Sequence, residues 1–333
     1  MTNVKRRTVL RGLASASVAL SASPIGSAFG QQASNYPSKP IRLLAGFPPG
    51  GPTDLICRLI AEDMSPRLGQ PIVVDNRPGA SGMLAHDALK SSPPDGHTLL
   101  VMAMPTMIAT LIAGKAFNPK DYTPLGFMWD SSFVILANPH SPYLSEVRTL
   151  KDLVAAVKAN PGKINYSSTG HGSTGHMLGV QLGLINRMDW THVGYKGVGP
   201  ASLDLLAGRI GVLFSGLPND NQLLQEGKVR AIGVSGPYRS PAYPDAPSMA
   251  ESGFPEIAVT TWGGLVGPAG MPKSIADRLS AELKITMDKP EILAKVISTG
   301  APRSGSAREL TARMAKDYDY FSRAIKEGNI KAE

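Results

Sequence analysis

The sequence has 333 residues, of which 42% are hydrophobic and 18% are charged, and it contains 35 glycines and 28 prolines. This composition is typical of a globular protein of about two domains, and it excludes a disordered chain or a coiled coil. The single cysteine, Cys57, excludes intramolecular disulfides and cysteine-based metal clusters. The formal net charge of +8 leaves nucleic acid, membrane surfaces and anionic ligands as candidate partners.

The amino-terminal segment carries half of this net charge. Four basic residues and no acidic residue lie in residues 1–30, and the pair Arg6-Arg7 precedes a short apolar stretch over residues 13–22. This arrangement predicts a cleaved secretory signal over residues 1–32, and the arginine pair resembles a twin-arginine signal. Removing the segment leaves a net charge of about +4, without a basic cluster that includes aromatic residues. We therefore expect a periplasmic protein that does not bind nucleic acid.

Strand and helix signals alternate along the rest of the chain. Strands are expected over residues 41–47, 71–76 and 97–103, with a helix from Thr53 or Asp54 to Gly69 and another over residues 79–91. A second series has strands over residues 133–138, 164–167, 192–195, 210–214 and 229–235, with helices over residues 149–160 and 173–186. From Pro272 onward the pattern is mainly helical. This alternation predicts an α/β fold of mostly parallel sheets flanked by helices.

Two irregular stretches suggest where domains begin and end. Residues 115–129 and residues 236–247 both interrupt the alternation. They bracket a unit of normal domain size, so we predict an inserted second domain over residues 132–239. The first domain would then be discontinuous, over residues 36–131 plus 240–333. An inserted domain is connected twice to its host, which predicts a cleft between two lobes.

Three glycine-rich loops join a strand to a helix, over residues 47–53, 77–82 and 167–175. In a parallel sheet such loops lie at the carboxyl ends of strands, where ligands bind. Glycine allows the backbone to approach a ligand, and a helix start offers unpaired N–H groups with partial positive charge. Any one loop can be explained as a tight turn, but three of them favour a site for an anion.

Enzymatic motifs are weak in this sequence. Residues 170–175 match the G-x-G-x-x-G dinucleotide fingerprint, but the following strand does not end in the acidic residue that would hold a ribose. Nucleophile-elbow, phosphate-loop and H-E-x-x-H motifs are missing, and the six histidines lack metal-ligand spacing. We expect His176 to be a hydrogen-bonded helix residue near the site, and Cys57 to be a core residue. We therefore predict no enzyme, no cofactor and no metal, with a nicotinamide-dependent oxidoreductase as the weaker alternative.

Several segments, taken in order along the chain, resemble one known family. They include residues 36–42 (YPSKPIR), 47–54 (FPPGGPTD), 68–80 (LGQPIVVDNRPGA), 94–100 (PDGHTLL), 160–163 (NPGK), 195–197 (YKG), 227–231 (GKVRA) and 262–270 (WGGLVGPAG). The sequence is identified by them as a member of the Bug family, the periplasmic substrate-binding components of tripartite tricarboxylate transporters. The match extends over nearly all of the chain after residue 35.

The resemblance implies a type II periplasmic binding fold, with two lobes that close on a ligand in the cleft between them. It implies that the loop over residues 47–54 grips a carboxylate, and that the loops over residues 79–82 and 168–173 complete the pocket. The expected ligand-binding residues are Phe47, Gly50, Gly51, Thr53, Asp54, Gly79, Ala80, Ser81, Thr106, Ser168, Thr169, Gly170, Ser173, Tyr195 and Lys196. Pro52 removes one amide donor from the first loop, and His171 is expected to bias the choice of ligand.

The expected function is capture of a small di-, tri- or aromatic carboxylate by an exported, monomeric protein. The expected partners are the membrane permease subunits of a tripartite transporter. A ligand-sensing receptor that docks on a sensor kinase of a two-component system is the alternative that the sequence leaves open. The sequence does not distinguish among the carboxylates.

Overall fold

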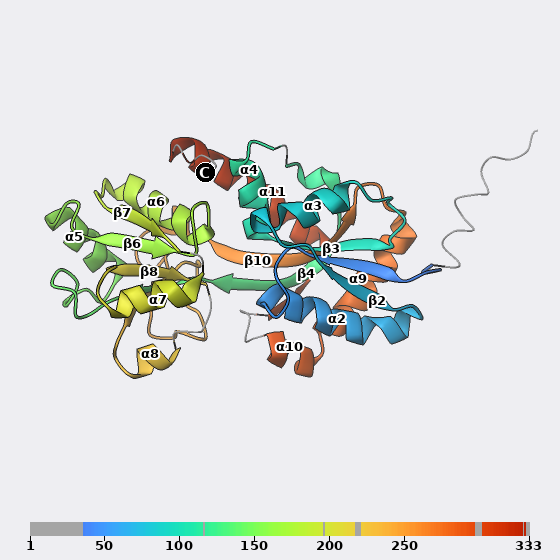
Figure 1. Cartoon of the computed structure of the whole chain (residues 1–333), viewed down its shortest axis with the longest axis horizontal. Helices are drawn as coiled ribbons and strands as arrows, with labels where there is room; N and C mark the ends of the chain where they lie inside the picture. Colours follow the sequence, from blue (N-terminus) through green and yellow to red (C-terminus); the bar gives the residue numbers. More distant parts are fainter. Residues whose placement is uncertain are drawn as a thin grey trace, which may run out of the picture. The chain divides into compact units, whose positions relative to one another are not determined.

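The computed structural model describes residues 36–115, 117–195, 197–216, 221–296, 302–328 and 330. The signal predicted over residues 1–32 and the candidate ligand residue Lys196 lie outside the described residues. Two sheets are flanked by helices, in the α/β arrangement expected from the sequence (Figure 1). Among the described residues, helices are too short or too polar to cross a membrane.

The first sheet has the strand order β11-β4-β10-β3-β1-β2. Its strands are β1 (Ile41–Ala45), β2 (Ile72–Asn76), β3 (Thr98–Ala103), β4 (Tyr122–Ser132), β10 (Thr260–Pro268) and β11 (Pro302–Gly305). One face is covered by α2 (Pro52–Leu68), α9 (Lys273–Met287) and α10 (Pro290–Val296), and the other by α3 (Met83–Lys90), α4 (Met104–Ile112) and α11 (Ala307–Glu327) (Figure 1). Short 3-10 turns span Ala80–Gly82 (η2), Pro119–Asp121 (η3) and Pro255–Ile257 (η5).

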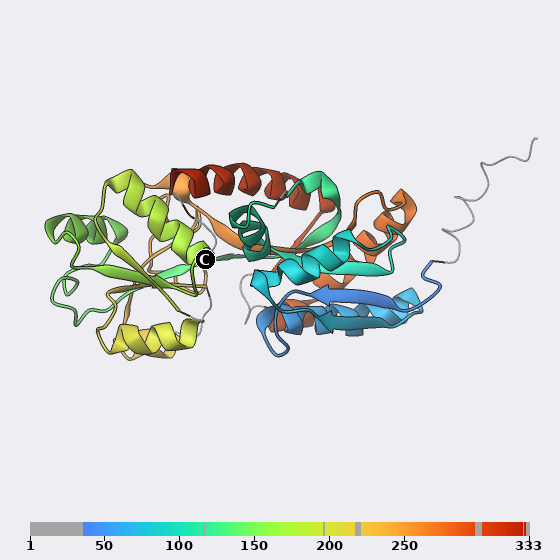
Figure 2. The same cartoon turned by 45° about the horizontal axis from the view of Figure 1, so that its top comes forward.

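The second sheet has the strand order β7-β6-β8-β5-β9. Its strands are β5 (Val134–Ala137), β6 (Asn165–Ser168), β7 (Thr191–Gly194), β8 (Val212–Ser215) and β9 (Arg230–Val234). The helices of this region are α5 (Leu150–Ala159), α6 (Thr174–Asn186), α7 (Val198–Leu206) and α8 (Asn221–Gln225). Figure 2 shows α6 and α7 on opposite faces of the sheet.

Alternation along β5 explains why the second sheet is covered on both faces. Successive side chains of a strand point to opposite faces, and here both faces are apolar. Ile135 packs into the cluster that contains α5 and α6 residues. Val134 and Leu136 pack instead with Ala201 and Leu205 of α7. These core side chains are buried, which is why the strand is an uninterrupted apolar run.

The expectation that residues 115–129 are irregular is wrong for most of that stretch. Strand β4 begins at Tyr122, and it pairs antiparallel with β10 from Tyr122↔Pro268 to Ser132↔Thr260. Its partner β10 was not predicted as a strand either, because its glycines weaken the strand pattern. Packing explains these glycines: a Cβ at Gly263 would lie 1.8 Å from the Trp129 ring. The central strands of the first sheet therefore require glycine where a strand pattern predicts apolar side chains.

Cys57 fits the core role expected from the sequence. The residue lies in α2 and is fully buried, and burial raises the pKa of its thiol far above the usual range. A thiol held protonated in this way is a poor nucleophile. Cys57 is therefore part of the packing of α2 against the sheet.

Candidate functional site

Three parallel strands place the loops of the first lobe at one edge. Strand β1 pairs in parallel with both β2 and β3, so Ala45, Asn76 and Ala103 end at the same edge of the sheet. The predicted residues of the first lobe all follow these three strand ends. Helix α4 starts directly after β3 and carries Thr106, which is buried in its first turn.

Asp54 organises the loop after β1. Its carboxylate accepts hydrogen bonds from the Gly50 N–H, the Asn76 Nδ2 and the Arg58 Nε, each at 2.9 Å. Asn76 also donates to the Phe47 carbonyl at 3.2 Å. The hydrogen bond from Arg58 is the main reason that the pKa of the Asp54 carboxyl is lowered to about 2. Asp54 is 3% exposed, so its side chain fixes the loop from inside, while residues 48–50 of the loop are exposed.

The first turn of α2 supplies the amides of this loop. The expectation that Thr53 or Asp54 caps the helix is wrong: Gly51 is the N-cap and Pro52 is the first helical residue. Proline suits that position because its fixed φ is helical and its missing N–H would be unpaired there anyway. The amides of Thr53 and Asp54 follow it, and first-turn amides have no carbonyl partner within their helix. The Gly51 N–H makes a long contact of 3.4 Å to the Pro48 carbonyl.

The loop after β2 has an unusual backbone. Residues 79 to 82 have successive φ values of 137°, 46°, 54° and 92°. Two of these residues, Ala80 and Ser81, are not glycine, and a side chain in the left-handed region costs about 1–2 kcal/mol. Backbone strain of this kind is concentrated at ligand sites, where surrounding packing holds it in place.

Close packing holds this strained turn against its neighbours. A Cβ at Gly82 would lie 2.5 Å from the Thr106 Oγ1, and a Cβ at Gly46 would lie 2.8 Å from the Gly82 Cα. The loops after β1 and β2 are therefore in close backbone contact, and the Thr106 side chain joins the end of β3 to them. Thr106 is 3% exposed, so it serves this packing in the described structure.

The second lobe repeats the arrangement with different chemistry. Strand β6 pairs in parallel with β7 and β8, and Ser168 ends β6. Its hydroxyl donates to the Gly170 carbonyl at 3.0 Å and accepts from the Ser173 hydroxyl at 2.9 Å. Ser173 is the N-cap of α6 and accepts from the His176 N–H at 3.3 Å. Hydroxyl groups therefore hold this loop, whereas a carboxylate holds the first one.

A buried histidine, His176, and a half-buried one, His192, support the same loop. The His192 Nε2 lies 2.8 Å from the Ser168 Oγ, and the His176 Nδ1 accepts from the Gly172 N–H at 3.0 Å. Burial lowers the pKa of His176 to about 3 and that of His192 to about 4, with smaller effects of the neighbouring histidines. Both imidazoles are therefore neutral at neutral pH. The expectation that His176 is a hydrogen-bonded helix residue is confirmed.

The remaining predicted residues of the second lobe lie at the ends of β6 and β7. Thr169 is exposed next to Gly170. Tyr195 follows β7, donates its backbone N–H to the Ser168 carbonyl at 3.0 Å, and donates its hydroxyl to the Asp204 carboxylate at 2.7 Å. That hydroxyl therefore anchors α7, and its pKa is raised to about 12 by burial and by Asp204.

A pocket of about 360 Å³ is lined by loops from both sheets. From the first come Ala80, Ser81 and the face of α4 that includes Ile112, and from the second come His171 and Gly172. Only Ala80 and Ser81 were on the predicted list. Thr106 of α4 was predicted, but the α4 residues that line this pocket were missed because the helix follows β3 directly and the two read as one apolar run. The one signal of a helix start is Pro105 in the first turn.

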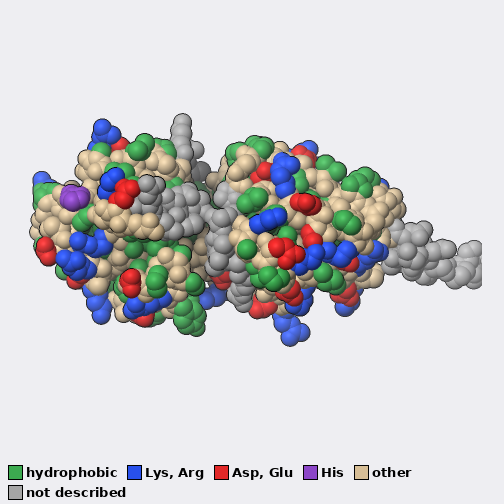
Figure 3. All heavy atoms as spheres, turned by 90° about the horizontal axis from the view of Figure 1, so that it is seen from below, with side chains coloured by type: hydrophobic (Ala, Val, Ile, Leu, Met, Phe, Trp, Pro, Cys, Tyr) green, Lys and Arg blue, Asp and Glu red, His purple; other side chains and the backbone are tan. Residues whose placement is uncertain are grey.

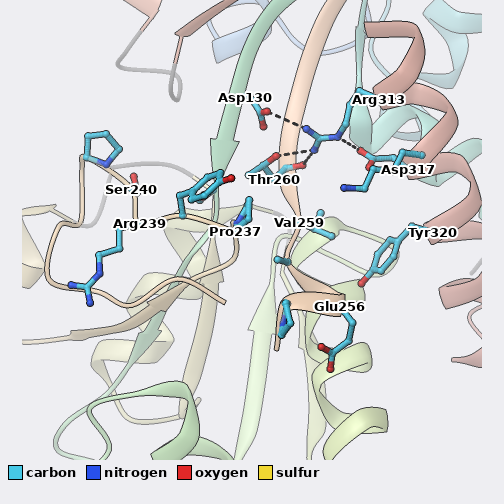
Figure 4. Close-up of a pocket in the computed structure, with 16 residues that line it drawn as sticks. Asp130, Pro237, Arg239, Ser240, Glu256, Val259, Thr260, Arg313, Asp317 and Tyr320 are labelled. Carbon is cyan, nitrogen blue, oxygen red and sulfur yellow. Dashed lines mark hydrogen bonds and ion pairs between the residues drawn. The ribbon is translucent and has the colours of Figure 1, made fainter. Parts of the chain in front are cut away.

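A larger pocket of about 580 Å³ lies where β4 and β10 meet α11 (Figure 4). At its wall the Arg313 guanidinium contacts the Asp130 carboxylate at 3.1 Å, the Asp317 carboxylate at 2.7 Å and the Thr260 carbonyl at 2.5 Å. Burial raises the pKa of Asp317 despite this cation. Arg313 thus connects α11 to both strands, and its charge is already neutralised by carboxylates of the protein.

The distribution of charged side chains on the surface agrees with the small net charge expected for the chain without residues 1–32. On the face drawn in Figure 3, basic and acidic side chains are interspersed over both parts of the protein. Many form ion pairs at exposed positions, such as Lys273 with Asp277 and Lys284 with Asp288. A ligand preference must therefore come from local backbone and side-chain geometry rather than from a long-range field.

The fold and the pocket together define the class of protein to which this chain belongs. Two α/β sheets direct their loop-bearing carboxyl edges toward a pocket that both line, and buried networks hold each loop in shape. Ligands of open α/β sheets bind at such edges. This is the architecture of a two-lobed solute-binding protein.

The family follows from comparison with known proteins. Residues 56–329 match the model of the tripartite tricarboxylate transporter family receptor, TctC. Protein BugT of Bordetella pertussis is 31% identical over 273 residues, which are 81% of this chain and 82% of BugT. The chain belongs to this receptor family, as the sequence resemblance predicted, and the family consists of periplasmic substrate-binding proteins and not of enzymes.

Solved structures give the same fold. A Rhodopseudomonas palustris protein solved with adipate is 26% identical with a TM-score of 0.73, over 89% of this chain and 99% of that one. MatC from the same organism, solved with malate, is 28% identical with a TM-score of 0.70, over 87% and 100%. The oxidoreductase alternative is wrong, because these relatives are binding proteins.

Proposed function

We propose that this protein captures a small carboxylate in the periplasm and delivers it to the permease subunits of a tripartite tricarboxylate-type transporter. The observation that carries the proposal is the exposed loop after β1, which a buried Asp54 holds next to the first-turn amides of α2. A helix start favours a negative charge through its unpaired N–H groups and its dipole. Relatives of the same fold have been solved with malate and with adipate.

In this proposal the two lobes have different tasks. The first-lobe residues Gly51 and Thr53 grip one carboxylate through backbone amides and water, and Phe47 and Gly50 line the same loop. Asp54 fixes the loop by accepting a hydrogen bond from the Gly50 N–H. The turn over residues 79–81 and Thr106 complete that side. The second-lobe residues Ser168, Thr169, Gly170, Ser173, Tyr195 and Lys196 select the rest of the ligand. We further propose that residues 132–239 form the inserted lobe, and that closure about β4 and β10 traps the ligand.

Thermal-shift measurements on the purified protein test the binding step. A ligand present at one hundred times its dissociation constant stabilises the folded state by about 2.7 kcal/mol, which raises the melting temperature by several degrees. We expect this with at least one carboxylate from a panel that includes malate, adipate, citrate and benzoate. The corresponding amide of that acid should give no shift. A panel without any shift would contradict carboxylate capture.

A variant assigns the binding to the proposed loop. At Gly51 the backbone is extended, with φ −80° and ψ 171°, so valine is sterically allowed there. We expect Gly51→Val to fold and to lose carboxylate binding, because its side chain covers the first-turn amides. Unchanged affinity would move the site away from this loop.

Export is tested separately. We propose that residues 1–32 are a cleaved twin-arginine signal. Changing Arg6-Arg7 to Lys-Lys should retain the protein in the cytoplasm, because that export route reads the arginine pair. Normal recovery in the periplasm would instead indicate the general secretory route.

A further inference from the structure

Three histidines whose sequence spacing does not match a metal-binding motif lie close together in the second lobe. His171 lies in the loop after β6, His176 in the first turn of α6, and His192 on β7. One ring nitrogen from each lies within 4.8 Å of the others. The ring centroids of His176 and His192 are 4.0 Å apart, and those of His171 and His176 are 4.5 Å apart. The parallel pairing of β6 with β7 causes this, because it sets His192 opposite Tyr166, two residues before the loop.

Hydrogen bonds around the cluster fix which nitrogen is available on His192. The Ser168 hydroxyl donates to the Gly170 carbonyl, so its oxygen accepts from the His192 Nε2–H at 2.8 Å. The lone pair of that imidazole is then on Nδ1. Metal-ligating histidines are oriented in this way, by a hydrogen bond from the nitrogen that does not ligate.

On His176 the Nδ1 lone pair accepts a single hydrogen bond, from the Gly172 N–H at 3.0 Å. That bond is worth about 1 kcal/mol, and Gly172 is a loop residue with φ +72°, so a stronger electron-pair acceptor can displace it.

We propose that His171, His176 and His192 form a binding site for a first-row transition-metal ion of the Zn²⁺, Co²⁺ or Ni²⁺ type. Three imidazoles suit these ions, whereas Mg²⁺ and Ca²⁺ prefer oxygen ligands. His171 is exposed and provides the route of entry, and its rotation brings the three nitrogens to the shorter separation that tetrahedral coordination requires. His171 and Gly172 also line the 360 Å³ pocket, so the fourth coordination position faces that pocket.

Metal titration of the purified protein tests this site directly, with an affinity tag that contains no histidine. We expect saturable binding of Co²⁺ at one ion per chain, seen as d–d absorption bands, and competition by Zn²⁺. His171→Ala should weaken binding by about tenfold or more while leaving the fold intact, because the side chain is exposed. His140→Ala is the matched control: His140 is an exposed histidine of the same lobe outside the cluster, and its loss should not change the affinity.

Three outcomes would overturn the site: no saturable binding, equal affinity in His171→Ala and the unchanged protein, or an equal loss in His140→Ala. Circular dichroism of each variant establishes that it is folded. The carboxylate panel is repeated with a chelator present, so that the two proposals fail independently. Carboxylate binding without metal binding would remove only the metal site, and the reverse would remove only the carboxylate proposal.

Discussion

The two loops at the carboxyl edges of β1 and β6 are built differently, although both open a helix after a parallel strand. The first is held by the buried carboxylate of Asp54 and by glycines in backbone contact. The second is held by the Ser168 and Ser173 hydroxyls and by neutral imidazoles. A carboxylate network and glycine packing allow one backbone shape, whereas hydroxyls can rotate and exchange partners. The first loop is therefore preorganised and the second is adaptable.

A methyl group added at Gly82, which packs against the loop after β1, should have the largest effect on stability. Gly82→Ala places a Cβ 2.5 Å from the Thr106 Oγ1 at a φ of +92°, so strain and overpacking together should cost about 2–4 kcal/mol. Gly50→Ala is the control, since its φ is +81° but, within the described part of the chain, no atom beyond its sequence neighbours lies within 4 Å of the added Cβ. It should cost about 1 kcal/mol. Urea unfolding measures both, and equal losses would mean that close packing does not hold the turn.

Removing the charge of Asp54 should come next. Asp54→Asn weakens three hydrogen bonds and is expected to lower the free energy of unfolding by about 1.5–3 kcal/mol. Asp75→Asn is the matched control on β2, because Asp75 pairs with Arg42 and Arg77 at a more exposed position and should cost less than about 1 kcal/mol.

The pH dependence of the stability of Asp54→Asn provides a second test of the role of Asp54. Folding lowers the pKa of this carboxyl from 3.8 to about 2, so its contribution is present above pH 4 and is lost as the pH falls toward 2. Stability of Asp54→Asn should therefore change less than that of the unchanged protein across this window. Parallel curves would show that Asp54 does not hold the loop.

The stabilisation that comes from the loop after β6 should be lost at a higher pH than the stabilisation that comes from Asp54. Folding lowers the pKa of His176 from 6.5 to about 3, so the contribution of the neutral ring is complete above pH 6.5 and is lost progressively as the pH falls below it. His176→Gln should lose about 1 kcal/mol at pH 7 and then show a flatter decline between pH 6.5 and 4. Unfolding at several pH values measures this, and an unchanged slope would argue against a buried neutral imidazole.

The smallest effect is expected at the exposed end of the same loop. His171→Ala, measured with a chelator present, should change the free energy of unfolding by less than about 0.5 kcal/mol, because the side chain is exposed. Thermal or urea unfolding would detect a larger loss, and such a loss would mean that His171 is part of the loop's structural support.

Sequence reasoning found the strands and loops that follow local rules. Apolar runs bounded by Gly and Pro located β1, β2 and β3, and helix-start chemistry located the loops after β1, β2 and β6. It missed β10, because Gly263 and Gly264 are required by the Trp129 ring and by Leu310, which lie far away in sequence. It missed β4, which contains Pro124 and Gly126, because Gly126 is required by Leu283 and the Gly305 backbone. No local sequence pattern predicts a contact between residues so far apart in the chain.

The histidine cluster was missed for a related reason. Spacing rules test whether two residues share one helical face, and His171 and His176 fail that test. The third member comes from β7, and only the pairing of β6 with β7 brings it near. A search for histidines at the ends of neighbouring parallel strands would have found the group, once the strand order was known.

One pairing in the second sheet bears on how such proteins diversify. Val134 begins β5 and Val234 ends β9, and these two residues are direct partners across neighbouring strands. All strands of the second sheet lie between them in sequence. A segment whose two ends lie side by side can be replaced by a homologous segment through only two splice points. Recombination between relatives could thus exchange the segment from Val134 to Val234 as a unit, while the part of the chain with the Asp54 loop stays unchanged.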